Sequence, residues 1–350
     1  MNYTTNQAPV RIKFADGEAP EPLWTSPDGY SSLYVGEATR MLSGIPDESI
    51  DCVWTDPPYL LSNGGITCVA GRMVSVDKGD WDKSRGIEAD YQFNLEWTRE
   101  CYRVLKPTGT IWVSGTLHIY PSIGMALLRN GFRLLNDIIW EKPNPPPNLG
   151  RRTFTHSTEV VFWASKAPKG SRHKYTFNYQ DMKHENGGKQ MKTVWRFTTA
   201  GKKEKQFGKH PTQKPITLID RCLRASTHPN DVVLDPFAGT ASTGVAALKV
   251  DRRFIGIEVN ESYAETGVKR LSEIYPPPVA QQETILTDTN RKPLPILQNC
   301  SRGETEIWPG AILVQAMLWS VWSSPRWKWV GTKFGGASTS VRALESVDIS

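Results

Sequence analysis

Short apolar segments alternate with segments of helical periodicity along most of the chain, and this alternation constrains the fold more than any other feature. Segments typical of buried strands lie at 32–34, 50–55, 110–114, 136–140, 232–234 and 254–258. Segments of helical character lie at 38–42, 91–105, 122–130, 215–226, 242–249 and 264–273. Strands that alternate with helices in this way predict an α/β fold with a doubly wound sheet.

The chain has 350 residues, more than one domain usually contains, so we expect one large domain with an insertion and a tail. The expected divisions are one half of the sheet at 30–140, an insertion at 141–209, the other half at 210–274 and a tail at 275–350. This tail is irregular and rich in tryptophan. Residues 60–90 show little periodicity, which predicts a long mobile loop of the kind that often forms a lid.

The segment 166–214 is strongly basic. It contains 13 Lys and Arg residues against 3 Asp and Glu, a balance of +10, whereas the whole chain carries +6. Aromatic residues are interleaved with these charges, namely Tyr175, Phe177, Tyr179, Trp195, Phe197 and Phe207. The segment is either a solvated basic insertion or a surface that contacts phosphates, with aromatic rings that pack or stack.

Composition argues against several other classes of protein. The five cysteines are scattered and form no Cys-x-x-Cys pair or Cys/His cluster, so neither a disulfide framework nor a metal site is predicted. The N-terminus is polar and does not resemble a signal peptide. The longest apolar stretch, 311–321, is interrupted by Gln315 and is too short to cross a membrane. We therefore expect a soluble cytoplasmic protein with reduced thiols and no membrane partner.

The first chemical motif is Asp56-Pro57-Pro58-Tyr59, which directly follows a predicted buried strand. The Asp56 carboxylate and the Pro57 carbonyl oxygen are two acceptors that could bind the hydrogens of an exocyclic amine and localise its lone pair. The prolines stiffen the turn, and Tyr59 offers a ring on which an extruded base could stack. The alternative is an ordinary turn at the end of a strand.

The second motif is Asp235-Pro-Phe-Ala-Gly239, which lies between a predicted strand and a predicted helix. Gly239 would let a ligand approach the backbone where the helix begins. About twenty residues later the next strand ends in Glu258, a spacing typical of a nucleoside bound in a Rossmann-like sheet, with the acid on the ribose hydroxyls. Ordinary βαβ packing is the alternative, and the absence of a Gly-x-Gly-x-x-Gly motif argues against a nicotinamide enzyme.

Several motifs together resemble the β-class DNA amino-methyltransferases. They are Asp-Pro-Pro-Tyr at 56–59, Lys-Pro-Asn-Pro-Pro-Pro-Asn at 142–148, Thr-His-Ser-Thr-Glu at 155–159, His-Pro-Thr-Gln-Lys-Pro at 210–215 and Asp-Pro-Phe-Ala-Gly at 235–239. In that family the catalytic motif precedes the cofactor motif, and the target-recognition region lies between them, as it would here at 141–209. The resemblance covers roughly residues 30–273 and is strongest to adenine-N6 enzymes of type IIS restriction–modification systems.

The resemblance implies a role for each matching residue. The catalytic, base-holding residues would be Asp56, Pro57, Pro58 and Tyr59. The residues that bind S-adenosylmethionine would be Glu37, Asp56, Lys214, Pro215, Asp235, Pro236, Phe237, Gly239, Thr240 and Glu258. Within the basic insertion we expect DNA contacts from Arg151, Arg152, Lys189, Lys192 and Arg196. One departure is Ala241, which stands where the family often has a second glycine and would narrow the approach of the backbone to the cofactor.

The implied reaction is methylation of N6 of adenine in double-stranded DNA, by base flipping and direct in-line transfer without a covalent intermediate or a metal. Methylation of cytosine N4 uses the same amine chemistry and remains an alternative, as do methylation of RNA or a protein glutamine and a catalytically weak DNA-binding relative. The first Asp of the tetrapeptide favours adenine by resemblance only. The sequence leaves open whether a cognate restriction endonuclease acts on the same site, and whether the protein is a monomer or a homodimer.

Overall fold

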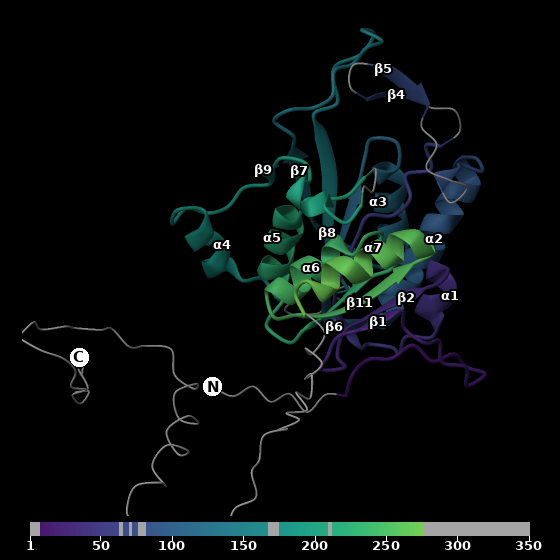
Figure 1. Cartoon of the computed structure of the whole chain (residues 1–350). Helices are drawn as coiled ribbons and strands as arrows, with labels where there is room; N and C mark the ends of the chain where they lie inside the picture. Colours follow the sequence, from purple (N-terminus) through teal and green to yellow (C-terminus); the bar gives the residue numbers. More distant parts are fainter. Residues whose placement is uncertain are drawn as a thin grey trace, which may run out of the picture. The chain divides into compact units, whose positions relative to one another are not determined.

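A nine-stranded mixed sheet forms the centre of the protein (Figure 1). The computed structural model describes residues 8–62, 82–166, 175–208 and 212–275, together with the backbone of 66–69 and 72–75. The strands, in their order across the sheet, are β1 (Trp24–Thr25), β2 (Ser32–Val35), β11 (Arg253–Glu258), β10 (Val232–Asp235), β3 (Ile50–Thr55), β6 (Leu105–Gly115), β8 (Thr158–Ser165), β7 (Arg133–Glu141) and β9 (Val194–Arg196). The predicted Rossmann-like α/β sheet is therefore confirmed.

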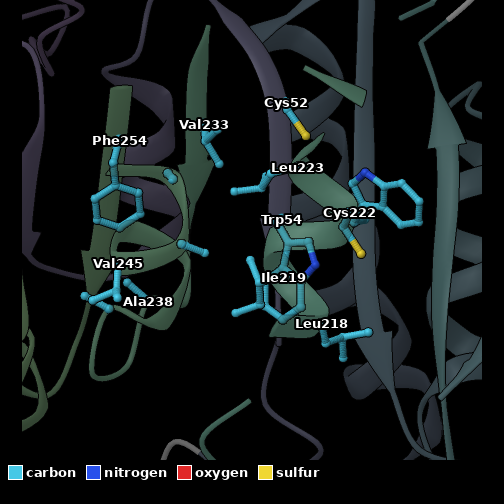
Figure 2. Close-up of a cluster of buried hydrophobic side chains, with 14 of the residues drawn as sticks. Cys52, Trp54, Leu218, Ile219, Cys222, Leu223, Val233, Ala238, Val245 and Phe254 are labelled. Carbon is cyan, nitrogen blue, oxygen red and sulfur yellow. The ribbon is translucent and has the colours of Figure 1, made fainter. Parts of the chain in front are cut away.

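Successive side chains of the central strands enter two separate hydrophobic cores, because neighbouring residues of a strand point to opposite faces. In β3, Cys52 and Trp54 belong to one core, whereas Val53 belongs to the other. Figure 2 shows Cys52 and Trp54 beside side chains of the helix α5 (Ile216–Ser226), among them Ile219 and Leu223. Both faces of the sheet are thus buried, as a doubly wound sheet requires.

Helices cover both faces of the sheet (Figure 1). The core that contains Trp54 is covered by α4 (Tyr179–Glu185), α5, α6 (Ser242–Lys249) and α7 (Glu261–Ser272). The opposite core is covered by α1 (Ala38–Ser43), α2 (Ile87–Val104) and α3 (Tyr120–Arg129). A short 3₁₀ turn, η2, occupies Lys203–Lys205.

The strand directions bring the functional loops to one edge of the sheet. β2, β11, β10, β3 and β6 are parallel, and β8 runs antiparallel to both β6 and β7. β7 is therefore parallel to β6, and it ends at the same edge of the sheet as β3 and β10. The loops that follow β3, β10 and β7 therefore share this carboxyl edge, where ligands bind in open α/β sheets.

Several predicted element boundaries were wrong. Residues 66–75, which were expected to lie in a loop, contain a hairpin of β4 (Ile66–Val69) and β5 (Arg72–Ser75), and α2 begins at Ile87. β6 begins at Leu105, directly after α2 and before the predicted strand start at 110, and its register shifts against β3. The segment 141–209 supplies β8 and β9 to the sheet. Of the predicted lid, residues 63–65, 70–71 and 76–81 lie outside the described residues, as does the tail beyond 275.

Candidate active site

The tetrapeptide Asp56–Tyr59 lies at the carboxyl end of β3, and its acid is held by two neighbours. Lys214 Nζ donates to Asp56 Oδ2 at 2.5 Å, and the Tyr59 hydroxyl donates to Asp56 Oδ1 at 2.7 Å. Asp82 fixes the end of the turn, because its Oδ1 accepts from the backbone amides of Tyr59 (3.0 Å) and Leu60 (2.9 Å). Each Asp56 oxygen keeps a second lone pair for another donor.

Glu159, near the start of β8, forms the other side of this cluster. The Tyr59 hydroxyl lies 3.2 Å from Glu159 Oε2, and Lys214 Nζ lies 3.5 Å from the same oxygen. Lys142, just after β7, forms an ion pair with Glu159 Oε1. The negative charges of the two carboxylates are therefore balanced by the positive charges of the two lysines, in a site where Lys214 is only 4% exposed. A buried charge is tolerated when it is paired and hydrogen-bonded in this way.

Burial and charge act in opposite directions on these groups. Burial raises the pKa of Asp56 above its ordinary value, and the Lys214 charge only partly offsets this. Burial also opposes the ionisation of Glu159, but Lys214 and Lys142 outweigh it and hold the pKa of Glu159 below its ordinary value. Burial, followed by the two carboxylates, raises the pKa of Tyr59 well above its ordinary value, so its hydroxyl stays protonated as a donor. Perturbed groups of this kind cluster at functional sites.

Asp235, at the end of β10, joins the two strand ends. Thr55 Oγ1 of β3 donates to its Oδ1 at 2.8 Å, Thr243 Oγ1 of α6 donates to its Oδ2 at 2.5 Å, and the Phe237 amide donates to Oδ1 at 3.1 Å. Burial raises the pKa of Asp235 to about 7. The carboxylate thus connects β3, β10 and α6, and the direct cofactor contact predicted from the resemblance stays a prediction.

The loop after β10 is fixed from two sides. The Gly239 amide donates to Glu258 Oε2 at 2.7 Å, which ties the loop to the end of β11. From α7, Arg270 donates to the Thr240 carbonyl at 2.5 Å and to Ser242 Oγ at 3.0 Å. Gly239 adopts φ +52°, a conformation that glycine takes without a side-chain penalty. These hydrogen bonds fix the shape of the loop.

A cavity of about 800 Å³ opens between these two motifs. It is lined by nearly all of the predicted site residues, namely Glu37, Asp56, Pro57, Pro58, Tyr59, Lys214, Asp235, Pro236, Phe237, Gly239, Thr240 and Glu258. Pro215 is not among the lining residues and is buried where α5 begins. The Phe237 ring lies 5.5 Å from Trp97 and 6.0 Å from Phe93, so it forms an aromatic wall. The volume is that of a small-molecule site.

The residues of the cavity fit a nucleoside with a charged side arm. An aromatic wall at Phe237 suits an adenine ring, and the carboxylate of Glu258 stands where ribose hydroxyls bind in Rossmann-like sheets. Glu37 is already engaged as the N-cap of α1, where it accepts from the amides of Thr39 (2.9 Å) and Arg40 (2.7 Å). Its contact with adenine stays a prediction. Such a contact would have to form while both carboxylate oxygens accept from these backbone amides.

Ala241 does not narrow the cavity. It is fully buried, is absent from the lining, and has left-handed backbone with φ +57° at the N-terminus of α6. Its methyl group faces α7, where a Cβ added to Gly267 would lie only 3.1 Å away. The methyl group that replaces the expected glycine is therefore accommodated by a glycine on the neighbouring helix rather than by the ligand space.

The five predicted DNA-contacting cations lie outside the cavity, and all are exposed. They are Arg151 and Arg152 on the loop between β7 and β8, Lys189 and Lys192 after α4, and Arg196 in β9. Arg196 Nε lies 3.7 Å from Glu141 Oε1 and forms an ion pair with it. No structural observation tests their contact with DNA, which stays a prediction.

The aromatic residues of the basic segment mainly pack. Trp195 is buried against Trp112, which itself stacks on Trp163 at 4.8 Å and 5°. Tyr175 contacts the edge of Trp163, and Arg221 lies over the ring of Phe197 at 4.4 Å. These rings attach the basic segment to the sheet by packing, and contact of the segment with phosphates stays a prediction.

Sequence reasoning gave no role to several residues of the cluster. Glu159 and Lys142 lie within two of the motifs that carry the resemblance, and that position was the available signal. Asp82 and Arg270 carry no local signature, because their partners are distant in the sequence. Among the residues that the structure describes, no group of three or more His, Cys, Asp or Glu side chains could hold a metal ion. No helix in this part of the chain is long and apolar enough to cross a bilayer.

A Rossmann-like sheet with Asp-Pro-Pro-Tyr and Asp-Pro-Phe-Ala-Gly on either side of one cavity defines the class of the amino-methyltransferases. The sequence matches the N6/N4 DNA methylase family over residues 50–269. The chain belongs to this family and is an enzyme that methylates DNA.

Curated relatives agree with this assignment. The chain is 52% identical to type II methyltransferase M2.LlaDCHI of Lactococcus lactis subsp. cremoris, over 69% of this chain and 89% of the relative. It is 52% identical to M2.DpnII of Streptococcus pneumoniae, over 68% and 88%, and 44% identical to M2.MboI of Moraxella bovis, over 73% and 93%. The finer type IIS subclass does not follow from these names and stays a prediction.

Solved structures share the fold. The complex of M1.HpyAVI with S-adenosylmethionine is 26% identical, with a TM-score of 0.51 over 68% of this chain and 98% of that one. The cytosine-N4-specific PvuII DNA methyltransferase is 20% identical, with a TM-score of 0.57 over 73% and 94%, and therefore supports the fold alone.

Proposed function

We propose that this enzyme transfers the methyl group of S-adenosylmethionine to N6 of adenine in double-stranded DNA at a specific sequence. The observation that carries the proposal is the position of Asp56. Its carboxylate is buried, hydrogen-bonded and charge-paired at the wall of a cavity whose opposite wall is the cofactor motif. The relatives named type II methyltransferases, and the S-adenosylmethionine bound to M1.HpyAVI, support the reaction and the methyl donor.

Different residues of the cavity bind the cofactor and orient the target base. Phe237 and Glu258 would hold the adenosine part of the cofactor, and the loop at Gly239 would hold its methionine part. When bound, S-adenosylmethionine supplies an electrophilic methyl group on a sulfonium. Asp56 and the Pro57 carbonyl accept the two hydrogens of the adenine amine, so that its lone pair faces this methyl group.

Tyr59 and Lys214 hold Asp56 in that role. The hydrogen bond from Tyr59 and the ion pair with Lys214 fix the carboxylate before the base arrives, so little reorganisation is needed during transfer. The Tyr59 ring also offers a face for the flipped base, with Lys214 Nζ 5.1 Å from the ring centroid. The proton released by the amine passes to solvent, with Asp56 as its first acceptor.

Incubation of the protein with S-adenosylmethionine and unmethylated DNA, digestion to nucleosides and mass spectrometry tests the proposal. We expect N6-methyladenine from the wild type and a loss of at least roughly 10²-fold in rate for Asp56→Ala, measured at saturating cofactor. N4-methylcytosine instead would keep the mechanism and overturn adenine. Folded protein that methylates neither base would overturn the proposal.

The proposal extends to partners and location. A cognate restriction endonuclease that cuts the same site is expected, because the relatives carry type II names. A cytoplasmic location accords with the free, buried thiols of Cys52, Cys101 and Cys222. Sedimentation of the free protein distinguishes a monomer from a homodimer.

A further inference from the structure

Phe154 is the most exposed large apolar side chain of the described residues, at 96% of its full exposure. It lies on the loop at 142–157 between β7 and β8. Most aromatic residues of the neighbouring basic segment pack against other rings, such as Trp112 and Trp163, whereas this ring is exposed to solvent. An exposed phenylalanine forgoes the free energy of burial, which a partner can recover.

The tip of this loop has a defined shape. The Asn148 side-chain amide donates to the Thr153 carbonyl at 2.9 Å and to Thr153 Oγ1 at 2.6 Å, and Asn148 Oδ1 accepts from the Gly150 amide at 3.0 Å. Arg151 adopts φ +51° between these contacts. A run of three prolines, 145–147, stiffens the approach to the tip. These hydrogen bonds and the prolines already order the loop, so it loses little conformational entropy when the ring binds a partner.

The loop starts and ends at the catalytic cluster. Lys142, at its beginning, and Glu159, two residues after its end, form an ion pair, and Glu159 lies 3.5 Å from Lys214, the partner of Asp56. The loop leaves the carboxyl edge of the sheet, where the cavity also opens. Two exposed arginines, Arg151 and Arg152, precede the ring and suit the phosphates on either side of a base step.

We propose that Phe154 enters the duplex as a wedge and occupies the space that the target base leaves when it flips. This inference rests on the proposed function. Apolar side chains that insert between base steps offset the cost of unstacking, and aromatic rings stack on bases of any sequence. The arginines hold the backbone while the ring fills the stack, so Phe154 acts on base opening and leaves the transfer step to Asp56.

The test compares Phe154→Ala with the wild type on two duplexes that share one sequence. In one the target adenine is paired, and in the other it faces an abasic site, so that less stacking and pairing must be broken. We expect Phe154→Ala to lower kcat/KM on the paired duplex by roughly ten-fold to a hundred-fold, with most of the loss recovered on the abasic duplex. Phe154→Trp should keep most of the wild-type rate.

Leu128→Ala is the matched control, because Leu128 is 53% exposed near the end of α3 that leads into β7, at the opposite edge of the sheet. It should change neither rate. With 2-aminopurine at the target position, its fluorescence should rise when the wild type binds and flips the base. This rise should be smaller for Phe154→Ala than for the wild type, and equal to the wild type for Leu128→Ala. An equal loss on both duplexes would overturn the wedge while the proposed function stands. A wild type inactive on both would overturn the proposed function and the wedge with it.

Discussion

At the scale of single residues, the ionisation of Asp56 depends on two neighbours with opposite effects. Lys214 favours the charged carboxylate, whereas the negative charge of Glu159 disfavours it. Because the proposed role of Asp56 is to accept hydrogens, activity should require its ionised form. The acid limb of the kcat/KM profile should therefore report the pKa of this cluster.

Glu159→Gln removes the negative charge beside Asp56. Ionisation of Asp56 then becomes easier and its pKa falls, so we expect the acid limb of kcat/KM to move to lower pH. A pH profile measured at saturating cofactor checks this shift. Glu265→Gln, an exposed acid on α7, is the matched control and should leave the limb in place. An unmoved limb in Glu159→Gln would show that the two carboxylates are not coupled.

Lys214→Met removes the cation that stabilises the ionised form of Asp56. The pKa of Asp56 should rise further, and the acid limb should move to higher pH, opposite to the shift in Glu159→Gln. The variant also leaves two carboxylates without their shared partner, so its thermal midpoint is measured beside the profile to separate folding from chemistry. Shifts of the same sign in both variants would contradict the assignment.

At the scale of elements, α7 and the cofactor loop are fitted to each other. Gly267→Ala would place a methyl group 3.1 Å from Ala241 Cβ and 3.1 Å from Leu33 Cδ2. We expect a loss of about 1–3 kcal/mol in the free energy of unfolding, measured with urea. Gly201→Ala is the control, since an added Cβ there meets nothing within 4 Å.

Ala241→Gly should recover part of that loss when combined with Gly267→Ala. The second change removes one of the two clashes and also relieves the left-handed backbone of Ala241, which costs a non-glycine residue about 1 kcal/mol. A double-mutant cycle over the four proteins measures the coupling. Strictly additive losses would mean that the two helices adjust independently.

The elements that sequence could predict were those with a clear period or a turn signal. The strand at 50–55 and the helix at 242–249 lie where their patterns placed them. β8 was missed because apolar residues lie on both of its faces, so its sequence does not alternate between apolar and polar residues. β9 was missed because three residues are too few to show a period. The ion pair of Lys214 with Asp56 joins residues 158 positions apart, which only the sheet order brings together.

At the scale of the whole molecule, net charge and its placement govern binding to DNA. The balance of +6 is concentrated in the segment 166–214 and supplemented by exposed arginines on the loop at 142–157. Each phosphate neutralised by a cation releases counterions, so affinity should fall steeply as salt rises.

The double change Arg151→Ala/Arg152→Ala should reduce the slope of log K against log salt concentration by up to about 2 and weaken binding to all DNA sequences alike. Arg129→Ala/Lys249→Ala removes the same charge from the ends of α3 and α6, at the opposite edge of the sheet, and should leave the slope nearly unchanged. Fluorescence anisotropy over a range of salt concentrations measures both. Equal slopes for the two double variants would place the DNA elsewhere.

The strand order also decides how specificity can be re-engineered. β8 lies between β6 and β7, and β9 pairs with β7, so a graft that exchanged 141–209 between relatives would replace two strands of the catalytic sheet. Such chimeras should fail to fold unless the donor sheet packs identically. Smaller grafts would avoid this problem. One would exchange the loop after Lys142 and before Ser157, and another the segment between α4 and β9. Either would replace an exposed surface and leave the strand hydrogen bonds of the sheet intact.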